Sequence, residues 1–149
     1  MTTSTQADFQ TYQLTEVHKM NLPLHVMLGN KKFILNFNRY RNTHFRVLNT
    51  AKVEYTKLVT QVLEDGDYFP RLLTGQYILS YKYFPRTRAV TDVANPLSVV
   101  DKFTQDALVQ NGVFIDDNHN YIKGVFYGFG EIDRVNPRAE LRIYKLSCG

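Results

Sequence analysis

Apolar runs separated by turn residues predict several strands along this chain. Residues 20–37 combine an apolar stretch, a turn at 29–32 and a second apolar stretch, which is typical of a β-hairpin. Residues 77–84 are rich in β-branched and aromatic side chains and end at a proline, so we expect a further strand there. Residues 121–128 and 138–144 have the same character and predict two closing strands.

Two segments carry the 3.6-residue periodicity of amphipathic helices. In the first, over about 50–64, four apolar residues recur at i, i+3, i+4 and i+7, namely Tyr55, Leu58, Val59 and Val62. Asn49 is its expected N-cap. The second segment covers about 96–110, with Asn95 as its expected N-cap and Asn111-Gly112 as its expected end. Residues 38–45 show no clear period and predict a loop.

The order of these elements, ββαβαββ, predicts an α+β fold. We expect a single domain with one mixed β-sheet and two main helices. The length of 149 residues suits one domain. The polar residues 1–16 predict a flexible N-terminal arm, and residues 17–149 then form the folded domain.

The sequence gives no indication of export or of a membrane partner. The N-terminal segment lacks the basic and then apolar regions of a secretory signal. No apolar run approaches the roughly 18–20 residues that a membrane span needs. Cys148 is the single cysteine, so a disulfide within one chain is excluded. We therefore expect a protein of a reducing, cytoplasmic compartment.

Charged residues are segregated along the chain. Residues 31–58 contain seven lysines and arginines against Glu54 alone, and a second basic cluster follows at Lys82, Arg86 and Arg88. Residues 92–117 contain five aspartates against Lys102 alone. A basic surface beside an acidic pocket suits a metal-dependent phosphodiesterase, because cations hold the polyanion and carboxylates hold the metal. A solvated surface of mixed charge is the simpler alternative.

The acids lie on both sides of the second expected helix. Asp92 precedes it, and Asp116 and Asp117 follow it by a few residues. A helix over 96–110 is about 22 Å long at 1.5 Å per residue. Four or five extended residues cover at most about 16 Å, so the chain returns only partly toward Asp92. We expect the acids to converge if the helix lies across the strand ends.

One set of motifs resembles the RusA family of phage and prophage Holliday-junction resolvases. The segment Asp92-Val93-Ala94-Asn95 is followed by Lys102, Asp106-Ala107-Leu108, Gly112 and Asp116-Asp117, with Arg86 and Arg88 upstream. The offsets between Lys102, Asp106, Gly112 and Asp116 are those of the family's core. The resemblance covers about residues 20–145, and its specific core has 26 residues.

The resemblance implies a homodimer that cuts four-way or other branched DNA with Mg²⁺, or with Mn²⁺ in its place. Asp92 and Asp117 match metal-binding aspartates, with Asp116 as a neighbouring acid, and Lys102 matches the catalytic lysine. The metal would activate a water for phosphodiester hydrolysis. The expected phosphate contacts are Arg39, Arg41, Arg46, Arg86 and Arg88. Tyr40 and Phe45 are candidates for base stacking.

The chain departs from the family pattern in two places. Ala94 stands where the family's common form has a second aspartate, and four extra residues separate Asn95 from Lys102. Asp101, which lies in the longer segment, is a candidate replacement ligand. Two other functions therefore stay open. One is a relative with the same fold that binds branched DNA, or a host replication or recombination protein, without cutting. The other is a nuclease for flap or fork DNA.

Overall fold

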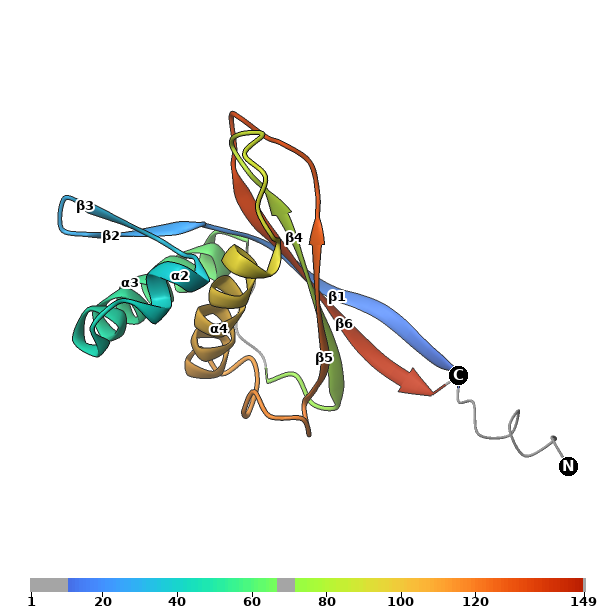
Figure 1. Ribbon diagram of the computed structural model, residues 1–149. Coiled ribbons are helices and arrows are strands. Elements are labelled where there is room, and N and C mark those ends of the chain that lie inside the picture. Colours follow the sequence, from blue (N-terminus) through green and yellow to red (C-terminus); the bar gives the residue numbers. More distant parts are fainter. Residues whose placement is uncertain (1–10, 67–71, 149) are drawn as a thin grey trace, which may run out of the picture.

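The computed structural model describes residues 11–66 and 72–148. The elements in chain order are β1 (Tyr12–Leu22), β2 (His25–Leu28), β3 (Lys31–Ile34), α2 (Phe37–Arg41), α3 (Phe45–Asp65), β4 (Gln76–Phe84), α4 (Ala94–Gln110), β5 (Ile122–Phe129) and β6 (Arg138–Cys148) (Figure 1). In this part of the chain, no helix is both long enough and apolar enough to cross a membrane.

The structure confirms the expected α+β domain with a mixed sheet and two main helices. Four strands form one sheet in the order β1-β6-β4-β5, and β2 and β3 form a separate two-stranded sheet. Strand β4 pairs with β5 in parallel, whereas the β1–β6 and β4–β6 pairs are antiparallel. Strands β2 and β3 form a β-hairpin with its turn at Gly29 and Asn30, which confirms the central part of the hairpin predicted over residues 20–37.

The helices cover one face of the four-stranded sheet, and no described helix covers the other face (Figure 1). Alternate residues of β4, namely Tyr77, Leu79 and Tyr81, are buried in the core together with Ala139, Leu141 and Ile143 of β6. Helix α4 contributes Phe103, whose ring meets the Tyr55 ring of α3 at 5.8 Å between centroids. This packing holds α4 between α3 and the sheet.

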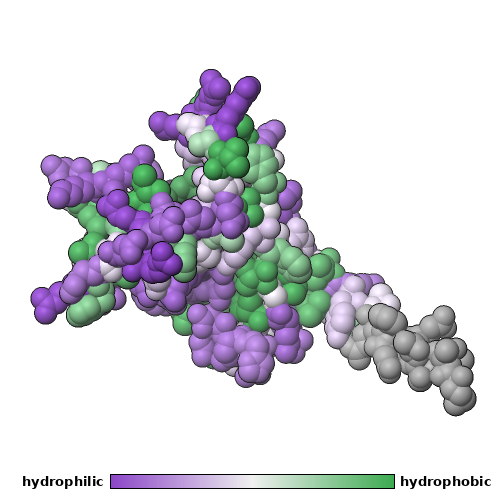
Figure 2. Space-filling model, viewed as in Figure 1, coloured by the Kyte–Doolittle hydropathy of each residue, from purple (hydrophilic) through white to green (hydrophobic). Residues whose placement is uncertain are grey.

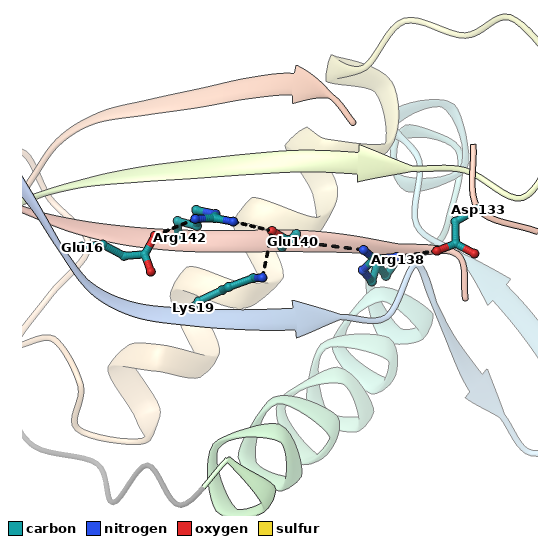
Figure 3. A network of polar contacts seen from close by, with 6 residues as sticks. All are labelled: Glu16, Lys19, Asp133, Arg138, Glu140 and Arg142. Carbon is teal, nitrogen blue, oxygen red and sulfur yellow. Dashed lines mark hydrogen bonds and ion pairs between the residues drawn. The ribbon is translucent and has the colours of Figure 1, made fainter. Parts of the chain in front are cut away.

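The uncovered face of the sheet carries a network of ion pairs around Glu140 (Figure 3). Glu140 is only 6% exposed, and its neighbours on β6 in the pleat are Arg138 and Arg142. Burial opposes ionisation of this carboxyl, but the hydrogen bond from Arg142 and the charge of Lys19 outweigh it and lower its pKa. The pairs join Lys19, Arg138 and Arg142 to Glu140, Arg142 to Glu16, and Arg138 to Asp133.

The N-terminal segment differs from the expectation of an arm over residues 1–16. Strand β1 begins at Tyr12, and its first residues pair with the end of β6, as in the Tyr12–Cys148 and Leu14–Leu146 partners. The polar composition of 12–16 is explained by this position, because an edge strand with one uncovered face does not need apolar residues. Residues 1–10 of the expected arm lie outside the described residues.

Two helix starts also differ from the expectation. The predicted loop 38–45 contains helix α2, whose N-cap is Asn36, and the beginning of α3. Helix α3 starts at Phe45 because the His44 ring accepts a hydrogen bond from the Arg46 amide and replaces Asn49 as the cap. In its additional first turn, residues 45–47 are exposed and only Leu48 packs against the core, so the sequence shows little apolar periodicity there.

Helix α4 begins at Ala94, before the expected position. The side chain of Asn95 does not cap it, because its Oδ1 accepts a hydrogen bond from the Phe37 amide at 2.9 Å. This hydrogen bond connects the start of α2 to the start of α4.

Candidate active site and nucleic-acid interface

The solvent-facing side of α4 carries the residues that the sequence singled out. Asn95, Ser98, Lys102 and Asp106 recur every three or four positions, so they lie in one line along the helix. All four are at least partly exposed, whereas the opposite side of α4 is buried. Asp92 precedes the first turn of this line. We call these five residues the α4 stripe.

Asp92 is exposed and forms a local turn immediately before α4, whose N-cap is Val93. Its Oδ1 accepts a hydrogen bond from the Ala94 amide at 3.0 Å, and its carbonyl oxygen accepts one from the Asn95 amide at 3.1 Å. It borders a shallow depression shared with Phe37 and Asn38 of the α2 segment. The hydrogen bond to the amide two residues further on is that of an Asx-turn, which explains an aspartate here without a metal.

Lys102 lies halfway along the stripe and is not paired with Asp106. Its Nζ is 5.4 Å from the centroid of the Tyr40 ring, a cation–π contact between α4 and α2. Asp106 instead has Lys52 of α3 as its partner, with 3.6 Å between Nζ and Oδ2. Lys102 therefore remains available for an anionic ligand.

Asp116 and Asp117 form an interacting pair in the loop after α4. The Asp117 amide donates a hydrogen bond to Asp116 Oδ1 at 2.8 Å, and the Asn118 side-chain amide donates to Asp116 Oδ2 at 3.0 Å. These bonds lower the pKa of Asp116, the backbone bond most strongly. Partial burial raises the pKa of Asp117, and the acids Asp116 and Asp106 raise it further. This end of α4 thus has an excess of negative charge.

Asp92 and Asp117 lie at opposite ends of α4. Asp117 lies in the loop between the end of α4 and the start of β5, and it interacts electrostatically with Asp106 in the fourth turn of the helix. Asp106 follows Ala94 by twelve residues, which is about 18 Å along the axis at 1.5 Å per residue. One chain therefore does not bring the expected ligands Asp92, Asp116 and Asp117 together. Among the residues with a described position, no three acids, histidines or cysteines are grouped so as to hold a metal ion.

Asp101 does not replace the missing aspartate at position 94. It lies on the buried side of α4, where it accepts hydrogen bonds from the Tyr127 hydroxyl at 2.8 Å and from Gln105 at 2.7 Å. The negative charge of Asp101 adds to burial in raising the pKa of Tyr127 and of Tyr81. The added helical turn thus supplies a core contact to the sheet.

The five candidate arginines are exposed and carry no carboxylate partner. Arg39, Arg41 and Arg46 each lie within 6.0 Å of a phenylalanine ring, and Arg86 and Arg88 lie in the loop after β4. None of the five forms an ion pair with any described residue. The arginines of β6, in contrast, are fully engaged by acids. The hairpin, the α2–α3 segment and the loop after β4 thus carry several cations that have no acidic partner among the described residues.

Two clefts border the β2–β3 hairpin on this basic side. The first, of about 420 Å³, lies between the hairpin, the end of β4 and the start of α4, and includes His25, Lys32 and Arg86. The second, of about 530 Å³, lies between the hairpin and the α2–α3 segment, and includes Lys31, Lys32 and Arg39. Lys31, Lys32 and His25 were missed as site residues, because the sequence places them in a turn and a strand without any motif.

Comparison with known protein families and with curated proteins finds no match to this chain.

Proposed function

We propose that this protein is a metal-dependent endonuclease that binds four-way or otherwise branched DNA. The observation that carries the proposal is the set of unpaired cations around the exposed side of α4. Helix α2 packs against α4 and carries Arg41 and Arg39, the second of which lies over the Phe33 ring of the hairpin. The loop after β4 brings Arg86 to the start of α4. A polyanionic backbone is the ligand that such a surface favours.

The carboxylates at the far end of α4 suit a hard divalent cation. Asp116 and Asp117 are adjacent and exposed, and the pKa of Asp117 is raised partly by other acids. A cation there would relieve this repulsion. Mg²⁺ in proteins commonly uses one or two carboxylates together with waters and substrate phosphates. Asp116 and Asp117 would therefore hold the ion, which would supply a polarised water for hydrolysis.

Asp92 joins this site only if two copies of the chain combine. A two-fold axis that sets two α4 helices antiparallel places the start of one helix beside the end of the other. Asp92 of one copy would then complete the pair Asp116 and Asp117 of the second copy. Such a homodimer has two equivalent sites, which matches the two strands cut in a symmetric junction.

Lys102 has the position and charge to contact the scissile phosphate. It is exposed in the middle of the α4 stripe, where its ammonium contacts the Tyr40 ring. The ammonium has no carboxylate partner among the described residues. Its positive charge would stabilise the negative charge that develops in the transition state.

A DNA-binding protein that does not cut is the second candidate. Ala94 in place of a carboxylate and the separation of Asp92 from Asp117 in one chain favour it.

A synthetic four-way junction separates the two candidates. We expect the protein to bind this junction in EDTA and to nick it when Mg²⁺ or Mn²⁺ is added. Asp117→Asn should remove nicking and retain binding, whereas Lys145→Asn, an exposed change in β6, should retain both. Binding without nicks under either metal, at saturating protein, would establish the second candidate. Absence of binding would refute both.

A further inference from the structure

We propose that the cleft of about 420 Å³ between the hairpin and the end of β4 holds one unpaired nucleotide of a DNA strand. This inference rests on the DNA-binding part of the proposed function and not on catalysis. It concerns a site away from the carboxylates at the far end of α4.

The cleft has the size and the walls of a small-ligand site. Its volume lies in the range of roughly 300–1,000 Å³ that is usual for such sites. Leu24 and Ile34 line it from the hairpin side, Tyr83 and Pro85 from the end of β4, and Pro96 from α4. In Figure 2 the surface is hollowed between the hairpin and the upper end of the sheet, with apolar side chains visible in the hollow. A flat apolar base fits such walls, whereas a duplex is far too wide.

The charges of the cleft select an anion. Lys32, Arg86 and His25 line it, and its lining contains no aspartate or glutamate. Neither Lys32 nor Arg86 forms an ion pair with a described residue. Burial lowers the pKa of His25, and the positive charges of Lys32 and Arg86 lower it further. No acid of the cleft offsets the positive electrostatic potential of these two cations. A phosphate would compensate it.

Apolar walls and cations together match a nucleotide, because the base requires the first and the phosphate the second. Branched DNA offers unpaired nucleotides at or near the branch point, where removing a base from the stack costs least. Asn95 lines both this cleft and the shallow depression that contains Asp92. A nucleotide in the cleft would thus fix the branch point next to the start of α4.

The direct test compares two fluorescent branched duplexes in EDTA. One carries an unpaired thymidine at the branch point, and the other carries an abasic residue there, which keeps the phosphate but lacks the base. We expect the thymidine duplex to bind at least about fivefold more tightly, since base–aromatic contacts are worth roughly 1–3 kcal/mol. Equal affinity for the two duplexes would overturn the inference.

A charge variant tests the phosphate half of the site. Lys32→Gln combined with Arg86→Gln should weaken binding of the thymidine duplex about tenfold or more, because two phosphate contacts are removed. The matched control, Lys123→Gln combined with Lys145→Gln, removes the same charge at the other end of β5 and β6 and should stay within about twofold of wild type. An equal loss in both variants would show a general charge effect and overturn the inference.

Two further outcomes identify the ligand and separate this inference from catalysis. Thymidine monophosphate at the concentration of the duplex should not displace it, and displacement would show a free nucleotide as the ligand and overturn the assignment to a strand. A preference for the thymidine duplex without metal-dependent nicking would support the cleft and refute the nuclease. Nicking without that preference would refute the cleft alone.

Discussion

Mixing two inactive variants tests whether the catalytic site is shared between two copies. Asp92→Asn and Asp117→Asn are each expected to abolish nicking. Asp92 precedes α4 and Asp117 follows it, and the helix rises about 18 Å between Ala94 and Asp106. Mg²⁺ binds its oxygen ligands at about 2.1 Å, so we expect that the two carboxylates of one chain do not hold the same ion. In a mixed dimer, one site carries both substitutions and the other carries neither. The mixture should therefore regain activity.

The expected fraction of active sites follows from the statistics of subunit exchange. Random exchange makes about half of the dimers mixed, and each has one intact site of two, so about a quarter of the wild-type sites return. These dimers should nick one strand of a four-way junction and not resolve it. The assay is denaturing electrophoresis of end-labelled junction strands after the variants have been exchanged. No nicking from a mixture whose subunit exchange is demonstrated, with wild type active, would refute the shared site.

Three other changes have defined outcomes. Arg39→Ala combined with Arg41→Ala should weaken junction binding and reduce the slope of log affinity against log salt by about 2, whereas Lys145→Ala should leave the slope unchanged in the same titration. Glu140→Gln should cost about 2 kcal/mol in urea unfolding at pH 7, because three cations lose their partner. Since folding lowers the pKa of Glu140, its contribution is present above the unfolded pKa and is lost as the pH falls through the folded value, so the difference should shrink as the pH is lowered below the ordinary pKa of a glutamate. Mg²⁺ should raise the melting temperature of the wild type by mass action and leave that of Asp117→Asn unchanged, and an equal rise in both would exclude this carboxylate as a ligand.

The elements that the sequence predicted well are those with one buried side. Strand β4 alternates between the core and the uncovered face. On α3 the predicted residues Tyr55 and Val59 are buried, but Leu58 is exposed and Leu63 is buried in its place, because the buried side of this helix repeats every four residues. Strand β1 was missed over residues 12–16, because an exposed edge strand is held by backbone bonds to β6 that composition does not encode. Helix α2 was missed for a related reason, since it has no buried residue and begins at the Asn36 cap.

The candidate site was predictable in its parts and not in its geometry. The spacing of Asp92, Lys102 and Asp117 locates them on and around one helix, and the structure agrees. We expected Asp92 and Asp117 to converge, which required the chain to reverse along the helix after Gln110. Asp117 instead interacts electrostatically with Asp106 in the fourth turn of α4, at the far end of the helix from Asp92. Asp101 illustrates the same limit, because only the rotation of α4 against the sheet decides that it faces Tyr127.

The distribution of charge gives an independent reason for an antiparallel pair of copies. On the uncovered face of the sheet, Arg138 and Arg142 are paired with acids. Along α4 the charges are instead separated, with Arg86 near the helix start and the excess of acids at its end. An antiparallel two-fold arrangement sets the acidic end of one copy against the basic end of the other, whereas a parallel arrangement opposes like charges. The antiparallel arrangement that would complete the proposed carboxylate set is therefore also the one that electrostatics would favour.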